Sequence, residues 1–378
     1  SNEGIIFGAV TLGSATTVDT NAISNGADIT FNGAITGGSN NLTLSTGNNI
    51  AGADVLSKVA ISGLGNLTLA DVGGTATFNA NIAAAAFSAD NTVANINLKG
   101  ASNTFTGAAS FANDGTLTIG DASSDSFAFN GGLAENTSGT VTLNSSISSS
   151  NDAIVFGAVT LGSNVTIDTN ATNTTGDLTI GAVTGGSNTL TLSTGNNIAN
   201  SDITASGAIS GVTTLTLIDV GGTASFSSNV VVTTLTVGNT VNNVSLTGNG
   251  TVTNAVTFGN DGTLTLGNAS GDSFTFDGGL TVSTASSTLA GSIDSSNDVI
   301  TFGAITLAAA TTIDTNASNT TGDITIGAVT GNNNNLTLDT ISTSGNASHT
   351  FTGDINLGSG ALDVDGDVVL GANVTVTA

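Results

Sequence analysis

Short runs of acidic and amide residues are the part of this sequence best suited to chemistry. An Asp-Thr-Asn triplet occurs at three places, beginning at Asp19, Asp168 and Asp314, and the last two copies are each followed by a Gly-Asp pair. Three further acids occupy alternate positions near residue 365. Carboxylate and amide oxygens are the ligands that hard cations such as Ca²⁺ prefer, so the pattern predicts a calcium site. The candidate ligands are Asp168, Asn170, Asp177, Asp314, Asn316, Asp323, Asp363, Asp365 and Asp367.

A plainer interpretation of the same residues stays open. Asp and Asn are also turn formers, because their side chains bond to nearby backbone and tolerate the left-handed conformation. The complete EF-hand loop with its terminal Glu is absent, and so is the glycine-rich nonapeptide of calcium-binding β-rolls. The motif therefore allows either a cation site or turn chemistry.

Catalysis is not expected, because the basic residues are too few and too scattered. The whole basic inventory is Lys58, Lys99 and His349, and no two of them occupy equivalent repeat positions. Polysaccharide-cleaving sites need grouped carboxylates together with basic or aromatic contacts to substrate. Paired acids such as Asp121 and Asp125 lack such partners, so no catalytic residue is predicted. His349 is expected to be a solvated turn residue.

The charge balance excludes further classes of function. The 378 residues carry 27 acids against two lysines, a formal net charge of −25. Such a chain cannot neutralise phosphates, so nucleic acid is not an expected partner. No apolar run approaches the roughly 20 residues needed to cross a bilayer, and no membrane insertion is predicted. Cysteine is absent, which suits a chain exported unfolded.

A long repeat organises the chain. FGAVTLGS at Phe7–Ser14 returns unchanged at Phe156–Ser163, 149 residues later, and other segments return after 148, 147 or 146 residues. Self-similarity at a fixed period is typical of solenoids and arrays. The predicted organisation is one continuous rod with long repeats at 1–149 and 150–295 and a partial third at 296–378.

A shorter period lies inside the long one. Asn-Leu-Thr-Leu begins at Asn41 and again at Asn66, and alternation of apolar and polar residues recurs throughout. Alternating runs between Gly, Asn, Asp and Ser clusters indicate short strands and turns. We therefore predict an all-β fold, a parallel β-solenoid of about 15 coils of roughly 24–25 residues, six per long repeat. Four leucines should stack inside it, namely Leu44, Leu69, Leu192 and Leu217.

The sequence resembles a family at this point. Strings such as GAITGGSNNLTLSTGNNI and TTGDLTIGAVTGGSNTLTLSTGNNI look like the repeats of large secreted bacterial β-helical exoproteins, the filamentous-haemagglutinin-like proteins and autotransporter passengers. The resemblance covers essentially the whole chain through compositional motifs. It implies a parallel β-helix that serves adhesion, biofilm formation or surface display. The family's amino-terminal secretion domain and a carboxy-terminal β-barrel are not recognisable here.

Together these observations predict a non-catalytic extracellular structural protein. It would be the stalk of a surface adhesin or the subunit of a cell-surface or extracellular-matrix fibre, with copies associating end to end. Cell-surface glycans and host or abiotic surfaces are the expected contacts. Two alternatives stay open, a surface-layer or sheath component and a solenoid module that binds cations, ice or glycans.

The ice-binding alternative depends on threonine pairs. Thr-x-Thr occurs repeatedly and would form outward ladders on a flat face, although Thr is also a favoured strand residue. Asn41, Asn66 and Asn335 stand where such a ladder needs threonine. The sequence therefore predicts an interrupted ladder.

Overall fold

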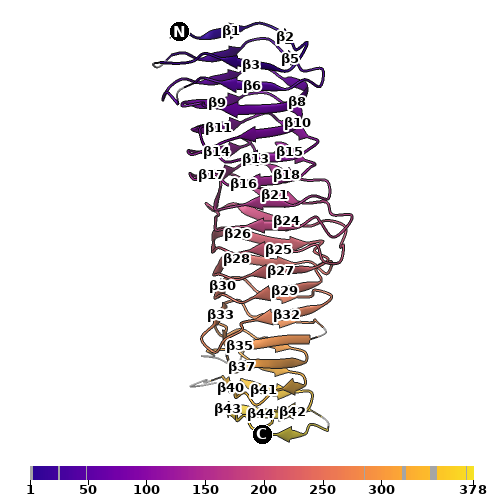
Figure 1. The fold of residues 1–378 in the computed structure, drawn as a ribbon. Coiled ribbons are helices and arrows are strands. Elements are labelled where there is room, and N and C mark those ends of the chain that lie inside the picture. Colours follow the sequence, from indigo (N-terminus) through magenta and orange to yellow (C-terminus); the bar gives the residue numbers. More distant parts are fainter. Residues whose placement is uncertain are drawn as a thin grey trace. The chain divides into compact units, whose positions relative to one another are not determined.

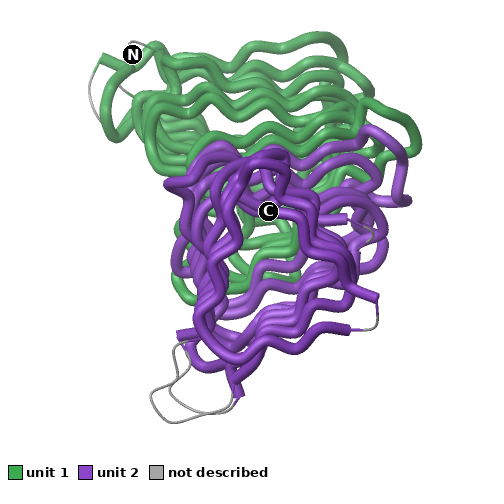
Figure 2. The backbone as a smooth tube through the Cα atoms, turned by 90° about the horizontal axis from the view of Figure 1, so that it is seen from below, with its two compact units in different colours: residues 1–193 green, residues 194–378 purple. Residues whose placement is uncertain are grey.

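The structure is a computed structural model, which describes residues 3–23, 26–47, 49–284, 286–316, 321–340, 347–371 and 373–378. The described residues form strands joined by turns and bends, without a helix, so none offers a helical membrane span. Their pairing makes a parallel β-solenoid of about 16 turns, which confirms the predicted fold class. The chain divides into two compact units, Ser1–Ser193 and Thr194–Ala378 (Figure 2).

The strands of unit 1 pair in three parallel ladders, here called faces 1A, 1B and 1C, and β8 and β10 each continue from one face to the next. Figure 1 labels many of these strands. Face 1A contains β1 (Ile5–Phe7), β4 (Ile29–Phe31), β7 (Val55–Ser57), β9 (Thr75–Phe78), β11 (Asn95–Leu98), β14 (Leu117–Ile119), β17 (Val141–Leu143), β20 (Val159–Leu161) and β23 (Val183–Thr184). Face 1B contains β2 (Val10–Thr11), β5 (Ile35–Thr36), the first parts of β8 (Ile61–Ala70) and β10 (Ile82–Ala89), β12 (Ser102–Phe105), β15 (Ser126–Phe129), β18 (Ser146–Ser148), β21 (Val165–Asp168) and β24 (Thr189–Ser193). Face 1C contains β3 (Thr16–Asp19), β6 (Leu42–Ser45), the second parts of β8 and β10, β13 (Ala109–Phe111), β16 (Leu133–Glu135), β19 (Ile154–Phe156) and β22 (Leu178–Ile180).

Unit 2 repeats this plan in faces 2A, 2B and 2C. Face 2A contains β25 (Ile203–Ala205), β27 (Thr223–Phe226), β29 (Asn243–Leu246), β32 (Thr263–Leu266), the first parts of β35 (Ser286–Asp294) and β37 (Ile305–Asp314), β39 (Val329–Thr330), β42 (Ile355–Asn356) and β45 (Val376–Thr377). Face 2B contains the first parts of β26 (Ile209–Ile218) and β28 (Val230–Val237), β30 (Gly250–Val252), β33 (Ser273–Phe276), the second parts of β35 and β37, β40 (Leu336–Asp339) and β43 (Leu362–Asp365). Face 2C contains the second parts of β26 and β28, β31 (Val256–Phe258), β34 (Leu280–Val282), β36 (Ile300–Phe302), β38 (Ile324–Ile326), β41 (Ser348–Phe351) and β44 (Asp367–Leu370).

The core of each unit follows from the alternation of apolar and polar residues. Successive strand side chains point to opposite sides, so every second residue is buried. All four leucines expected inside are fully buried, and Leu44 lies in register with Leu69 on the next coil. Their neighbours Thr43 and Thr68 are also in register and are only half-buried. The predicted strand phase is therefore confirmed.

Phenylalanine rings from successive coils stack on one another inside the core. The rings of Phe7 and Phe31 lie 5.0 Å apart and nearly parallel, and those of Phe105 and Phe129 lie 5.2 Å apart. Identical residues at equivalent positions on successive coils place the rings at the spacing of the strands, about 4.8 Å. Aromatic stacking thus reinforces the register of the coils.

The length of a coil varies more than the sequence period suggests. The partner of Ile29 on the next coil is Val55, whereas the partner of Val141 is Val159, so the first of these coils is much longer than the second. The predicted coil length came from the most regular segments. Turns absorb the differences, because a residue added to a corner does not disturb the pairing of strands on either side.

The long repeat does not contain a whole number of coils. On face 1A, six coils lead from Phe7 to Leu143 and a seventh leads on to Leu161. Phe156, the sequence equivalent of Phe7, lies between these two positions on face 1C. The long repeat therefore holds more than the six coils expected and fewer than seven. As a result, equivalent segments of successive long repeats lie on different faces, as β1 and β19 do.

The compact units also differ from the long repeats in their limits. Unit 1 ends at Ser193, inside the second long repeat, which begins at residue 150. The sequence period and the compact units are thus separate features of the chain.

Candidate functional site

The Asp-Thr-Asn triplets form copies of one turn. Asp168 accepts a hydrogen bond at Oδ1 from the backbone N–H of Asn170, with an N···O distance of 2.8 Å, and Asn170 has φ of 47°. The corresponding distance from Asp314 to Asn316 is 2.6 Å, again with φ of 47°. This is an Asx turn followed by a left-handed residue, a conformation that Asn tolerates well.

The threonine between them closes the loop that follows. Thr169 is fully buried and donates from Oγ1 to the carbonyl oxygen of Gly176 at 2.5 Å. Thr315 makes the same bond to Gly322 at 2.7 Å. Each bond brings the Asp-Thr-Asn end of the loop to the Gly-Asp end. The two halves of the motif therefore belong to one loop in each copy, and residues 317–320 of the second copy lie outside the described part.

The second acid of each motif links one coil to the next. Asp323 accepts from the backbone N–H of Ser348 at 2.7 Å and from its hydroxyl at 3.2 Å. Asp177 is also engaged in an interaction. The same arrangement occurs at other corners: Asp54, which precedes β7, accepts from the N–H of Thr75 at 2.7 Å. The acid thus satisfies a backbone donor at the corner where the ladder of the sheet is interrupted.

Asparagines do the same at other corners. Asn41 accepts from the N–H of Asn66 at 2.8 Å, and Asn335 accepts from that of Ala361 at 2.9 Å. Asn41 and Asn335 directly precede β6 and β40, whereas Asn66 lies within β8.

Threonine columns are unbroken over some coils and interrupted elsewhere: on face 2A, Thr306 and Thr330 are followed in register by Asn356. On face 2C the in-register residues are Thr257, Thr281, Thr301, Thr325 and Thr350.

The three acids near residue 365 are divided between two strands. Asp363 and Asp365 both lie on β43, where they are exposed. Asp367 begins β44 on face 2C, beyond a turn at Gly366, whose φ is 135°. The turn therefore separates Asp367 from the two acids with which it alternates in sequence.

An unexpected ladder of aspartates lies on face 2B. Four carboxylates are in register on consecutive coils, so neighbouring backbones are about 4.8 Å apart. The members are Asp294, Asp314, Asp339 and Asp365. Burial raises the pKa of Asp294, which the hydrogen bond from Ser292 opposes. Burial also raises the pKa of Asp314, against the backbone bond from Asn316, and the charges of Asp339 and Asp294 raise it further.

This ladder contains two predicted ligands, Asp314 and Asp365, and two residues that the sequence analysis missed. The four aspartates are unequally spaced along the chain, so their alignment in one column could be recognised only from the register of the coils. Within the described ranges, no three His, Cys, Asp or Glu side chains are placed to hold one metal ion. The structure therefore does not identify these residues as metal ligands, and the calcium site stays a prediction.

Of the paired acids noted in the sequence, Asp125 caps a turn. Asp125 accepts at Oδ2 from the N–H groups of Asp121 and Ala122, at 2.9 and 3.0 Å. Asp272, its equivalent in the second long repeat, accepts from two N–H groups in the same manner. A carboxylate that accepts two backbone bonds stabilises the turn locally.

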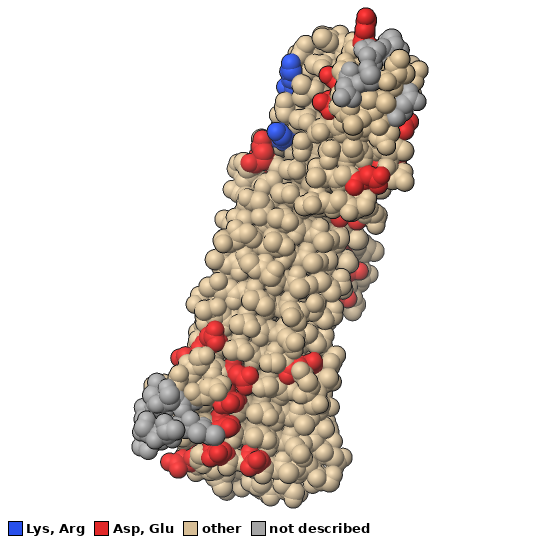
Figure 3. Space-filling model, turned by 90° about the vertical axis from the view of Figure 1, so that its left-hand side faces the viewer, with Lys and Arg blue, Asp and Glu red and all other residues tan. Residues whose placement is uncertain are grey.

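The basic residues occupy two environments. Lys58 and Lys99 follow β7 and β11 at the same corner of unit 1, two coils apart, and are the blue side chains of Figure 3. His349 was expected in a solvated turn, and this prediction is wrong. It is fully buried on β41, in register with Ile324, because the alternation of that strand points it inward.

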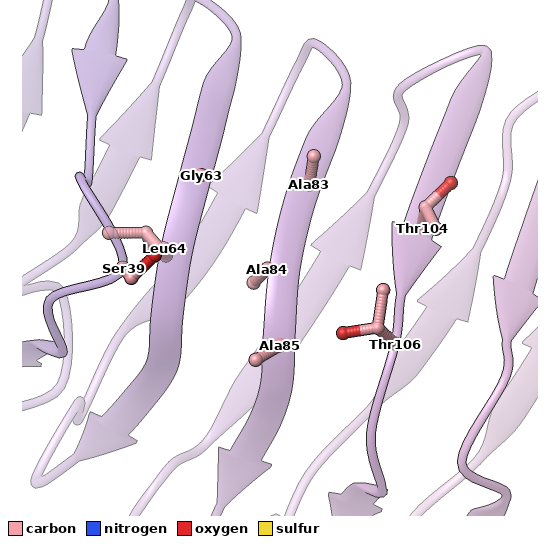
Figure 4. Close-up of a pocket in the computed structure, with 8 residues that line it drawn as sticks. All are labelled: Ser39, Gly63, Leu64, Ala83, Ala84, Ala85, Thr104 and Thr106. Atoms are coloured by element: carbon pink, nitrogen blue, oxygen red, sulfur yellow. The ribbon is translucent and has the colours of Figure 1, made fainter.

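A shallow groove of about 300 Å³ marks the side of unit 1 (Figure 4). It is lined by uncharged residues, mostly small, including Gly63 and Ala83–Ala85. Gly63 has φ of 62° and lies where β8 and β10 shift register. The second long repeat has Val231 in place of Ala83, and Val231 is 46% exposed. A smaller groove of about 180 Å³ lies around Val231, and neither groove is lined by a charged residue.

Acidic side chains lie in rows separated by broad uncharged areas (Figure 3). Some of these acids cap corners, as Asp54 and Asp323 do, and others stand on strands, as the members of the aspartate ladder do. Comparison with known proteins identifies no relative: no family model, no curated protein and no solved structure matches the chain.

Proposed function

We propose that the protein is a non-catalytic extracellular structural element, the stalk of an adhesin or the subunit of a surface fibre. The observation that supports this proposal most is that its polar side chains form hydrogen bonds between successive coils. Asp and Asn side chains bond coil to coil at the corners, as Asp323 does to Ser348 and Asn249 to Ser273. Side chains that could perform chemistry are thereby engaged in holding the stack together.

The location is tested on intact cells. An antibody against the chain should label cells of the source organism without permeabilisation, and brief protease treatment of those cells should remove the signal. Labelling only after lysis would contradict an extracellular role. A periplasmic control protein, which must stay unlabelled in the same cells, shows that the envelope is intact.

End-to-end association of copies is the second part of the proposal. An edge strand carries unpaired N–H and C=O groups that can pair with another chain. On β44 the apolar residues Val368 and Leu370 are 50% and 55% exposed, and a further coil would cover them. A contact between unlike ends propagates into a fibre. Electron microscopy should therefore show filaments, and a dispersed monomer with and without millimolar Ca²⁺ would contradict it.

Binding to an ordered surface such as ice is a second candidate, favoured by one observation. Five threonines in register on face 2C place hydroxyl and methyl groups at the coil spacing, without an intervening charge. Thr301→Lys and Thr325→Lys should abolish any inhibition of ice growth, whereas Thr337→Lys on face 2B should leave it unchanged. Absence of inhibition by the unaltered protein would remove this candidate.

A further inference from the structure

Face 2C of unit 2 is interrupted at one step between coils. The strands β31, β34, β36, β38, β41 and β44 form a sheet of their own, and no register pair joins β31 to β28 on the preceding coil, although the structure describes every residue of both strands. Across the same step, β29 pairs with β32 on face 2A and β30 pairs with β33 on face 2B. These two coils are therefore joined on two faces and open on the third, and this gap is here called the 2C break.

The equivalent step of the first long repeat is closed. There, β10 pairs with β13 through residues 87–89. Beyond these pairs, the backbone N–H of Ala112 donates to the carbonyl oxygen of Ala89 at 3.0 Å, whereas the equivalent bond from Gly259 to Val237 is not formed. The two repeats place the same strands here, so a local difference in side chains must account for the break.

Two larger side chains hold the coils apart at the 2C break. In the first repeat, the N–H of Gly107 donates to the carbonyl oxygen of Ala85 at 2.5 Å, and a Cβ on Gly107 would lie only 3.0 Å from that oxygen. Its equivalent Asn254 has this Cβ, and its N–H lies 2.9 Å from the equivalent carbonyl oxygen. Asn254 Nδ2 also donates to Oγ1 of Thr234 at 2.8 Å, where the first repeat has Ala86. The pair Asn254–Thr234 thus stands between the two coils.

The second repeat also lacks an aromatic pair that holds the closed step together. Phe87 stacks on Phe111 of the next coil with ring centroids 4.9 Å apart, so these rings join β10 to β13 inside the core. Leu235 stands in place of Phe87 in the second repeat, and Phe258, the equivalent of Phe111, cannot form this ring pair with it. Stacked rings stabilise a contact beyond the area that they bury. The open step therefore has weaker contacts in its core as well as in its backbone.

A cleft of about 360 Å³ lies at the 2C break. It is lined by residues of β28 and, on the next coil, by Ala255, Thr257 and Gly259. Val237, which ends β28, is 9% exposed, whereas its equivalent Ala89 is 4% exposed. Solvent thus approaches the core at the step where the two strands leave their backbone groups without ladder partners.

We propose that the 2C break, held open by Asn254 and Thr234, is an opening point of the solenoid, at which β28 and β31 separate reversibly while faces 2A and 2B stay paired. Local opening requires less free energy where backbone bonds and buried contacts are few. The two intact faces keep the register, so the coils can close again. This property belongs to the stack of coils and does not depend on an extracellular location. In a stalk it would allow bending at one fixed level.

Labelling of a buried thiol measures the opening, because the chain has no cysteine of its own. Val237→Cys places a thiol beside the break, and Ala89→Cys places one at the equivalent position of the closed step, each in the whole chain. Without denaturant, Val237→Cys should react with a small disulfide reagent about tenfold faster or more, since a lost ring pair alone is worth about that factor. Crowding by the larger side chain at residue 89 would speed its labelling and so works against this expectation.

Exchange of side chains between the repeats tests the cause of the opening. Asn254→Gly with Thr234→Ala introduces the small residues of the first repeat and should slow labelling at position 237 to near the rate at position 89. Gly107→Asn with Ala86→Thr should have the opposite effect at position 89. Labelling at 237 that is no faster than at 89, or that Asn254→Gly with Thr234→Ala leaves unchanged, would overturn the proposal.

Hydrogen exchange on the unaltered protein covers the case in which the variants do not fold. After correction for intrinsic rates, the amide of Gly259 should exchange about tenfold faster or more than that of Ala112. The amide of Ser283, which donates to the carbonyl oxygen of Phe258 at 2.9 Å one coil further on, should stay protected, because the opening is confined to one step. Equal protection of Gly259 and Ala112 would show a closed ladder and would contradict the proposal.

Discussion

Asp314 and Asp339 lie in register on successive coils of face 2B, with both carboxylates on the outward side of the sheet. Asp294 continues the column on the preceding coil, so like charges repeat at the spacing of the strands. Like charges directly opposite each other on paired strands are destabilising. The most regular feature of the fold thus brings together groups that repel one another.

We expect Asp314→Asn to stabilise the protein at pH 7 by less than about 1 kcal/mol, since the site is partly exposed. The amide removes the charge but can still accept from the N–H of Asn316. Asp168→Asn is the matched control, because its neighbours in register are Ser148 and Ser193. Thermal unfolding measures both, and equal shifts in the two variants would contradict repulsion within the ladder.

The aspartate ladder should also make the stability of the protein depend on pH. Burial raises the pKa of Asp294 and of Asp314, so the fold favours their neutral forms. Their charged forms destabilise the fold at neutral pH, and this penalty is relieved as the pH falls through the raised pKa values towards 3.8. The contribution of these two residues to stability should therefore rise on acidification from pH 6 to 4. The gain should shrink in Asp294→Asn/Asp314→Asn.

The left-handed residue of the Asx turn predicts a contrast between two substitutions. Asn170 has φ of 47°, which costs an L-residue with a side chain about 1–2 kcal/mol, less for Asn and nothing for Gly. Asn170→Ala should therefore lower the free energy of unfolding by about 1 kcal/mol, whereas Asn170→Gly should change it little. Urea titration distinguishes the two, and equal losses would show that the amide bond to Ser149 matters more than φ.

The core predicts a much larger effect. Leu192 is fully buried, and Leu192→Asp would place an unpaired charge there, which should destabilise the protein by several kcal/mol. Thr191 precedes it and is half-buried on the outward side, so Thr191→Asp is the control. A near-native melting temperature for Leu192→Asp would contradict the assigned strand phase.

The calcium prediction requires a reversible response to metal. Millimolar Ca²⁺ should raise the melting temperature, EDTA should reverse the rise, and Asp168→Ala with Asp314→Ala should abolish it. Screening of the −25 charge by any cation could imitate this response. Equal stabilisation by Mg²⁺ and by NaCl of the same ionic strength would therefore show that these residues form turns and do not bind Ca²⁺ specifically.

The sequence by itself determined the class of fold and the identity of its core. Alternation of Leu and Thr specifies which side of a strand is buried, because the period of a strand is two wherever it occurs. That local rule placed Leu44 and Leu192 inside without knowledge of their neighbours. It also indicated that Asp168 and Asn170 suit a turn, since an Asx turn is made within a single short segment.

Only the tertiary structure decided which residues lie side by side between coils. Neighbours in a column are separated by stretches of chain of unequal length, because the corners between the strands vary in length. The aspartate ladder, the burial of His349 beside Asp365 and the different faces of β1 and β19 all depend on those lengths. Adding or removing one residue in a corner leaves the alternation of each strand intact. The register between coils therefore cannot be predicted from the local pattern.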